Sequence, residues 1–281
     1  MPAVVALDVR VRAGHPSIAI LGEERMGSGT LVDSGGYILA VNYVILGAET
    51  VGVTLIDGRQ FQARVVARDY ESGMGLLKIP PKDLAAIRLG SSFDLCLGQE
   101  VFLIGAIGGT ERRVTNGVVS YLGEFEAHWE FALDKGVGLT TVNPGFGGAP
   151  VFDLAGRVVG ITLVNLPELL RSTLAVPIER YQLHRTELLE FGRIRSRPER
   201  AWVGVYVQPA AGGALVGGLV PGGPADQAGL LEGDMIIAVD FCTIENRRDF
   251  YEELWKHHPG EALVLKVLRD GAVDIMTVIA G

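Results

Sequence analysis

Residues 143–150 read NPGFGGAP, a glycine-rich turn that leads into two short apolar runs, Val151–Asp153 and Val158–Thr162. Such turns between short runs of β-branched residues are typical of paired β-strands. The same alternation extends outward from this turn over most of the first 161 residues. It predicts further strands at residues 1–13, 30–32, 37–41, 50–55, 62–68, 76–79, 100–104 and 113–122. So many short strands indicate a β-barrel or a β-sandwich.

The pattern changes character after residue 177. Apolar residues near helical spacing predict a helix over Ile178–Phe191, capped by Gly192. The polar, basic run at 193–200 is typical of a linker. Beyond it we predict a helix that starts at the N-cap residue Asn246, and strands at 202–207, 214–220, 235–239, 262–268 and 274–279. The predicted organisation is a domain at residues 1–195, a linker at 196–201 and a second domain at 202–281.

The composition excludes several classes of protein. The 281 residues carry a formal net charge of −8, so the chain lacks the basic surface that nucleic acids and anionic lipids bind. Cys96 and Cys242 fall in different predicted domains, and we expect buried thiols or thiols in a reducing compartment rather than a disulfide. Neither a zinc-ligand spacing nor a membrane-spanning apolar run occurs, so no metal, cofactor or membrane span is expected. Without a signal pattern the chain reads as cytoplasmic, or as periplasmic if a signal has been removed.

Three segments resemble the HtrA/Deg family at its most diagnostic places. They are residues 27–45, residues 68–79 and residues 143–161. Their order and spacing fit that family from about residue 20 to the end of the chain. The resemblance implies a mainly β protein, with a trypsin-like double six-stranded β-barrel followed by a PDZ domain.

All three positions of the family's catalytic triad carry other residues in this chain. The family pattern TNNHVV contains the histidine base, and here residues 40–45 read AVNYVI, with Tyr43 in its place. The aspartate of ETDLAVLKI becomes Gly73. The serine of NPGNSGGP becomes Gly147, preceded by Phe146. A serine needs an imidazole to remove its proton and a carboxylate to orient that imidazole, so the resemblance implies a pseudoprotease.

The sequence leaves two questions about the loop at residues 143–150 undecided, whether it still forms an oxyanion hole and whether it leaves space for a substrate. The amides of Gly145 and Gly147 retain the positions of an oxyanion hole, and Phe146 has the bulk to fill the space of a substrate. The alternative to a pseudoprotease is a hydrolase with residual or altered catalysis that uses Tyr43 or His128.

Residues 202–281 resemble the family's PDZ domain through WVGV at 202–205, VPGGPA at 220–225, AGLLEGDMI at 228–236 and LRDG at 268–271. By resemblance, the amides of Val203, Gly204 and Val205 receive a peptide's terminal carboxylate. The helical spacing of Arg247, Tyr251 and Leu254 puts them on one face, which lines the groove by resemblance. Simple core packing is the alternative for Tyr251 and Leu254, and Phe250 is expected in the core. Arg247 favours an acidic or hydrogen-bonding side chain near the end of the peptide.

These observations predict a protein that binds C-termini or unfolded segments through its PDZ domain, as a scaffold, a chaperone in protein quality control or a regulator of an active relative. The resemblance also implies a homotrimer. A further hypothesis concerns residues 124–135, where Phe125, His128, Trp129, Glu130 and Phe131 indicate a docking patch for a partner.

Overall fold

The computed structural model of the chain describes residues 2–81, 83–166 and 172–281. They form two compact units. The first unit holds Met1–Phe125 and Leu133–Arg195, and the second holds Glu126–Ala132 together with Ser196–Gly281. Positions 1, 82 and 167–171 of the predicted first domain lie outside the described residues. The second unit is therefore built from two separate stretches of the chain, the short segment at 126–132 and the C-terminal part from residue 196.

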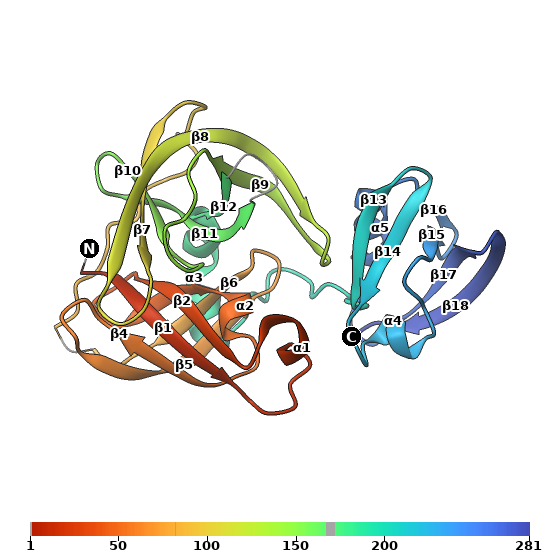
Figure 1. Cartoon of the computed structure of the whole chain (residues 1–281), viewed down its shortest axis with the longest axis horizontal. Helices are drawn as coiled ribbons and strands as arrows, with labels where there is room; N and C mark the ends of the chain where they lie inside the picture. Colours follow the sequence, from red (N-terminus) through yellow and green to blue (C-terminus); the bar gives the residue numbers. More distant parts are fainter. Residues whose placement is uncertain (1, 82, 167–171) are drawn as a thin grey trace. The chain divides into compact units, whose positions relative to one another are not determined.

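The first unit begins with a closed six-stranded barrel in the order β1-β2-β3-β6-β5-β4 (Figure 1). All of its strand pairs are antiparallel. Apolar side chains such as Val5, Leu39 and Leu77 are fully buried and fill the barrel. The strands are β1 (Val4–Val11), β2 (Glu24–Leu31), β3 (Tyr37–Val41), β4 (Ala48–Thr54), β5 (Gln60–Asp69) and β6 (Met74–Lys78), and the short helices are α1 (Ile18–Leu21) and α2 (Asn42–Ile45).

A second closed barrel follows in the order β10-β11-β12-β9-β8-β7. Helix α3 (Glu179–Phe191) comes after it and ends at Gly192, whose φ of 71° lies in the left-handed region that favours glycine. The double-barrel fold and this helix with its cap are confirmed. The strands are β7 (Glu100–Ala106), β8 (Arg112–Ala127), β9 (Phe131–Leu139), β10 (Pro150–Asp153), β11 (Val158–Leu166) and β12 (Ser172–Pro177).

Strands β9 and β12 are absent from the sequence prediction. In β9 the cause is composition, because its glycines and charged residues disfavour strands. Two of those glycines allow close packing against neighbouring side chains. A Cβ atom at Gly138 would lie 2.8 Å from the Cβ of Tyr121, and one at Gly136 would lie 2.9 Å from the Cδ1 of Leu174. The barrel wall packs too closely there for a larger residue.

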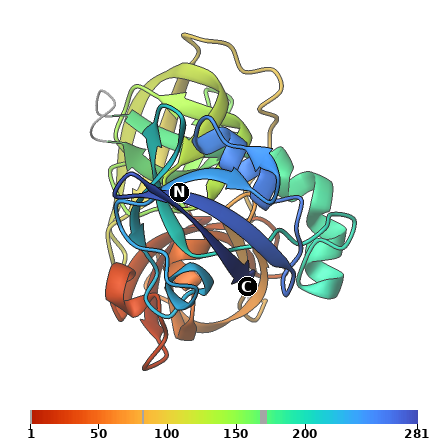
Figure 2. The same cartoon turned by 90° about the vertical axis from the view of Figure 1, so that its right-hand side faces the viewer.

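The second unit contains a six-stranded sheet in which β13-β14-β15-β17-β18 follow one another and β16 pairs with β15. Strand β13 thus lies at one edge. Helix α5 (Arg247–Leu254) packs against β13, β14 and β15 (Figure 2). The Asn246 side chain accepts a hydrogen bond from Asp249 N–H, which confirms the predicted N-cap. The elements are β13 (Val205–Ala210), β14 (Gly213–Leu219), α4 (Pro224–Gln227), β15 (Met235–Val239), β16 (Cys242–Thr243), β17 (Ala262–Arg269) and β18 (Ala272–Ile279).

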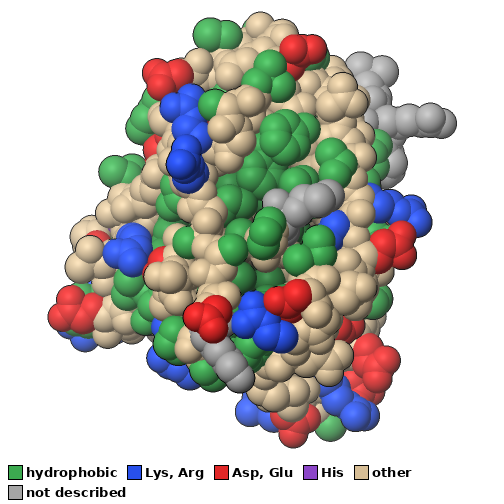
Figure 3. Space-filling view, turned by 90° about the vertical axis from the view of Figure 1, so that its left-hand side faces the viewer, with side chains coloured by type: hydrophobic (Ala, Val, Ile, Leu, Met, Phe, Trp, Pro, Cys, Tyr) green, Lys and Arg blue, Asp and Glu red, His purple; other side chains and the backbone are tan. Residues whose placement is uncertain are grey.

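The two cysteines and a group of hydrophobic side chains lie at the surface of the protein. Cys96 and Cys242 are free, and both are exposed, so of the two alternatives given for these thiols burial is wrong. Hydrophobic side chains gather near the middle of the face shown in Figure 3, with charged side chains mostly toward its edges. Within residues 2–81, 83–166 and 172–281, no helix has the length and apolar character needed to span a bilayer.

A buried ion pair between Asp234 and Arg269 contributes to the stability of the second unit. Asp234, whose side chain is 2% exposed, accepts hydrogen bonds from Nε and Nη2 of Arg269 at 2.7 and 2.6 Å. These bonds hold the pKa of Asp234 below its ordinary value. Because removing one partner leaves a buried charge, Arg269→Met should lower the free energy of unfolding at neutral pH by about 3 kcal/mol.

The depressed pKa fixes the sign of the pH dependence. The stability that the pair contributes is fully present above the unfolded pKa of about 4 and is lost as pH falls through the lower folded pKa. Urea titrations of the full chain and of Arg269→Met should therefore differ at neutral pH and converge in acid. An equal difference at both pH values would contradict this assignment.

Candidate functional site

The structure brings Tyr43 and Gly147 into contact. Tyr43 lies in helix α2, and Gly147 lies in the loop between β9 and β10. A Cβ atom built on Gly147 would lie 1.9 Å from the Tyr43 hydroxyl oxygen, inside any permitted contact distance. Burial raises the pKa of Tyr43 to about 12. The Tyr43 hydroxyl therefore occupies the space that a side chain at position 147 would need.

Gly73 lies next to the same helix. Its carbonyl oxygen accepts a hydrogen bond from Asn42 N–H at 2.8 Å, and Asn42 immediately precedes Tyr43. Gly73 has a φ of 72°, in the left-handed region that other residues adopt only at a cost of about 1–2 kcal/mol. Tyr43 and Gly147 thus meet in the first unit, and the backbone of Gly73 lies beside Asn42, the residue that precedes Tyr43.

The loop that carries Gly147 is held by hydrogen bonds to strand β2. Ser28, which is fully buried, donates from its N–H to Gly147 O at 2.8 Å and from its hydroxyl to Phe146 O at 2.8 Å. The same hydroxyl accepts from Ala106 N–H at 2.9 Å. Gly148 follows with a φ of 94°. The backbone of the loop is thus fixed independently of the residue at position 147.

The backbone amides of this loop are partly engaged. Gly145 N–H donates to Asn143 Oδ1 at 3.2 Å, and Phe146 N–H donates to Ala106 O at 3.0 Å. The side chain of Phe146 is half-buried. Of the two amides expected to form an oxyanion hole, that of Gly145 therefore already has an acceptor within the chain.

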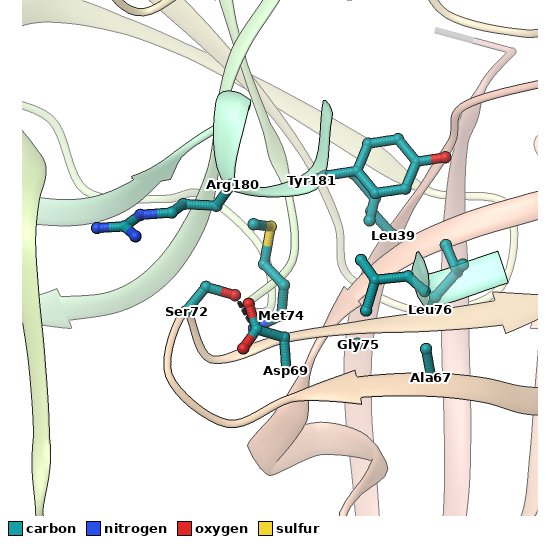
Figure 4. A pocket seen from close by; sticks show the side chains of 10 residues that line it. Leu39, Ala67, Asp69, Ser72, Met74, Gly75, Leu76, Arg180 and Tyr181 are labelled. Atoms are coloured by element: carbon teal, nitrogen blue, oxygen red, sulfur yellow. Dashed lines mark hydrogen bonds between the residues drawn. The ribbon is translucent and has the colours of Figure 1, made fainter. Parts of the chain in front are cut away.

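A small cavity lies beside Gly73, along strand β6 (Figure 4). Its volume of about 10 Å³ holds at most about one water molecule. Ser72 Oγ accepts a hydrogen bond from Met74 N–H at 3.3 Å in its wall, and Asp69, Arg180 and Tyr181 also line it. The cavity is too small for a substrate side chain.

A histidine–serine pair in the first unit was not among the predicted site residues. Nδ1 of His15 lies 2.7 Å from Oγ of Ser17, and Arg25 Nη2 donates to the same Oγ at 2.6 Å. Ser17 is 9% exposed, and burial, followed by nearby arginines, lowers the pKa of His15. The two residues are separated by a single position, a spacing that carries no family signal. Their hydroxyl is engaged and buried, so it is poorly placed to attack a substrate.

In the second unit, the predicted carboxylate loop surrounds a carboxylate. The N–H groups of Val203, Gly204 and Val205 donate to the Glu130 carboxylate at 3.0, 2.6 and 2.7 Å. Burial raises the pKa of Glu130 to about 7, while these three hydrogen bonds act in the opposite direction. The three amides therefore converge on one carboxyl group, as the resemblance predicted for a peptide terminus.

Two of the three predicted groove residues on α5 contact residues 126–130, the stretch that contains Glu130. Tyr251 donates from its hydroxyl to Ala127 O at 2.8 Å and accepts from Glu130 N–H at 3.0 Å. Arg247 donates to Glu126 O at 3.2 Å, and its Nε lies 3.4 Å from the Glu126 carboxylate. Leu254 is fully buried in the core of this unit, where Phe250 also lies.

The aromatic stretch at residues 124–135 divides between the two units. Residues 126–132 belong to the second unit. His128, an exposed residue, packs edge-on against Trp129 with ring centroids 4.7 Å apart, and it lies 6.0 Å from the Tyr206 ring. His128 thus lies in the second unit, whereas Tyr43, Gly73 and Gly147 lie in the first.

Comparisons with known proteins agree with this two-part organisation. Residues 27–161 match the model of the trypsin-like peptidase domain, and residues 201–279 match the model of the PDZ domain. A probable periplasmic serine endoprotease DegP-like of Halomonas elongata is 32% identical over 282 residues, covering 92% of this chain and 57% of that protein. The corresponding protein of Hahella chejuensis is 32% identical over 262 residues, covering 87% and 54%. The chain spans about half the length of the curated relatives it matches.

Solved structures extend the likeness over the whole chain. The HtrA-type protease AlgW with a tripeptide has a TM-score of 0.60 and 27% sequence identity, covering 100% of this chain and 93% of that one. AlgW with a decapeptide has a TM-score of 0.58 and 26% identity, covering 100% and 95%. Both domains and their order are thus shared with proteins of known structure.

The contact between Tyr43 and Gly147 yields a testable coupling. Gly147→Ala should lower the free energy of unfolding by about 1–3 kcal/mol, because its Cβ atom overlaps the Tyr43 hydroxyl. In a Tyr43→Ala background the same substitution should cost clearly less, since only the contact with the Leu163 carbonyl oxygen at 3.2 Å remains, and a double-mutant cycle from urea titrations should give a coupling energy above about 0.5 kcal/mol.

Gly52→Ala provides the matched control for this cycle. Its Cβ atom would meet nothing closer than 3.5 Å, so its effect should add to that of Tyr43→Ala. Additivity of Gly147→Ala with Tyr43→Ala would show that the two positions are not in contact.

Proposed function

The chain belongs to the HtrA/DegP family of serine endoproteases with a trypsin-like domain and a PDZ domain, and we propose that within this family it is a non-catalytic member that binds peptides. Its ligands are protein C-termini or unfolded segments, bound by the PDZ domain. It acts as a scaffold, as a chaperone in protein quality control or as a regulator of an active relative.

The case against proteolysis rests on the loss of both reacting groups. Gly147 has no side chain to attack a carbonyl carbon. Tyr43, with its pKa near 12, keeps its proton at neutral pH and is a poor general base. The hydroxyl of Tyr43 also fills the space that a nucleophile at position 147 would occupy. This overlap is the observation that carries the proposal.

The remaining catalytic device of the family is an oxyanion hole. Such a hole alone retains only a small part of a protease's acceleration. The hydrogen bond from Gly145 N–H to Asn143 Oδ1 removes one of the two expected donors. The loop at residues 143–148 therefore keeps its backbone conformation but lacks the groups that proteolysis needs.

The case for peptide binding rests on the three converging amides of the second unit. Val203, Gly204 and Val205 already hold a carboxylate at hydrogen-bonding distance, so the loop can accept a peptide's terminal carboxylate. The solved structures of the similar AlgW protease contain a tripeptide and a decapeptide. Arg247 beside an acidic side chain supports a preference for acidic residues in the ligand.

Assembly as a homotrimer through the trypsin-like domain is part of the proposal. It follows from the family resemblance, and the hydrophobic side chains gathered on the face in Figure 3 are compatible with a buried subunit contact. Sedimentation equilibrium should give three times the chain mass of 30.0 kDa. A mass equal to one chain at micromolar concentration would contradict it.

The competing reading is a hydrolase with altered catalysis, and a digestion assay separates the two. The purified chain should leave casein intact over a time in which an active relative of the family degrades it completely. Turnover that disappears in Tyr43→Phe, His128→Ala or Ser17→Ala would identify an altered mechanism and contradict the proposal.

Peptide binding is tested on the same sample. A peptide with a free terminal carboxylate should bind at least about 10-fold more tightly than its amidated form, since charge-assisted hydrogen bonds contribute about 1.5–3 kcal/mol. Equal affinities would show that the amides of Val203–Val205 do not read the terminus.

A further inference from the structure

We propose that the segment Glu126–Ala132 is an internal ligand of the PDZ groove, in which the Glu130 side-chain carboxylate takes the place of a peptide's terminal carboxylate. An incoming C-terminus must then displace this segment. The inference rests on the proposed function, since it assigns the occupant and the regulation of the same groove.

The first observation is the geometry at Glu130. Its carboxylate accepts three backbone N–H groups at 2.6–3.0 Å, from the residues that are placed to read a terminal carboxylate. Glu130 has a φ of 50°, a conformation that non-glycine residues seldom adopt. Such a residue persists where its surroundings determine it, and here its N–H is also bound by the Tyr251 hydroxyl.

The second observation is a single main-chain hydrogen bond at a sheet edge. Strand β13 lies at the edge of its sheet, and Val207 N–H on that strand donates to His128 O at 2.7 Å. His128 and Glu130 lie in the turn between β8 and β9, two residues apart, so the same turn reaches both the edge strand and the three amides. The segment therefore uses both elements of PDZ recognition, a main-chain bond to the edge strand and a carboxylate in the loop.

The third observation is the contact with helix α5 on the other side of the groove. Tyr251 donates to Ala127 O, and Arg247 binds both the carbonyl oxygen and the carboxylate of Glu126. Backbone and side-chain contacts thus run from Glu126 to Glu130. They also specify the chemistry of a competing ligand, a peptide with an acidic residue four positions before its terminal carboxylate.

The consequence is competition for one set of amides. A terminal carboxylate and the Glu130 carboxylate cannot both accept the N–H groups of Val203–Val205. A tethered ligand of this kind has an effective concentration on the order of millimolar. An external peptide therefore binds more weakly than the groove itself allows, and removal of the Glu130 carboxylate raises its affinity.

Amide hydrogen exchange of the full chain tests the occupancy without any external ligand. The amides of Gly204, Val205 and Val207 should exchange at least about 10-fold faster in Glu130→Ala than in the unaltered chain. Glu124→Ala is the matched control, since it removes an exposed carboxylate from the same stretch of β8 outside the segment. Amides of Val264–Val267 in β17 should be unchanged, which excludes general unfolding. Equal exchange at the three groove amides would overturn the inference.

A peptide of residues 124–130 with an amidated end tests the role of the Glu130 side chain, since it has no terminal carboxylate. It should bind Glu130→Ala at least about 10-fold more tightly than it binds the unaltered chain or Glu124→Ala. The same peptide with glutamine at its last position should lose this binding. Equal binding of both peptides would contradict the assigned role of the carboxylate.

The two readouts separate this inference from the proposed function. Fast exchange in Glu130→Ala together with no binding of free-carboxylate peptides would retain the internal ligand and reject the proposed function. Free-carboxylate peptides that bind the unaltered chain and Glu130→Ala equally, with equal exchange, would reject the internal ligand and retain the proposed function.

Discussion

The hydroxyl of Tyr43 and a side chain at position 147 cannot occupy the same space, and the proposed loss of catalysis depends on this exclusion. A Cβ atom at position 147 would lie 1.9 Å from that hydroxyl. The loop nevertheless keeps its backbone, because Ser28 binds both Phe146 and Gly147 from strand β2. The geometry of a protease loop is thus preserved by contacts that do not involve a nucleophile.

The second unit presents the groups that the proposed peptide binding requires. Three amides hold a carboxylate, an edge strand is available for pairing, and α5 supplies Arg247 and Tyr251. Because backbone donors do not depend on side-chain identity, these amides can bind a carboxylate whatever side chains the loop carries. The proposed internal ligand lowers the affinity for external peptides, since a peptide must displace Glu130 before it binds the groove.

Local patterns of turns, strands and caps predict a barrel or a sandwich and helix α3 with its Gly192 cap, whereas the double barrel and the PDZ fold follow from the resemblance to the HtrA/Deg family. The sequence does not predict β9, whose glycines are explained only by the neighbouring Tyr121 and Leu174. It singles out Glu130 within an aromatic stretch, but nothing in the local pattern places that carboxylate on amides more than 70 residues later. The His15–Ser17 pair is likewise invisible, since it depends on tertiary contacts with Arg25.

The central claim is that no serine of this chain is activated for attack on a carbonyl group. Reaction of the purified full chain with a fluorophosphonate probe, followed by intact mass measurement, tests this most directly, because the probe modifies activated serines covalently. The account predicts an unchanged mass under conditions in which an active relative is modified completely. A stoichiometric adduct on any serine would contradict it.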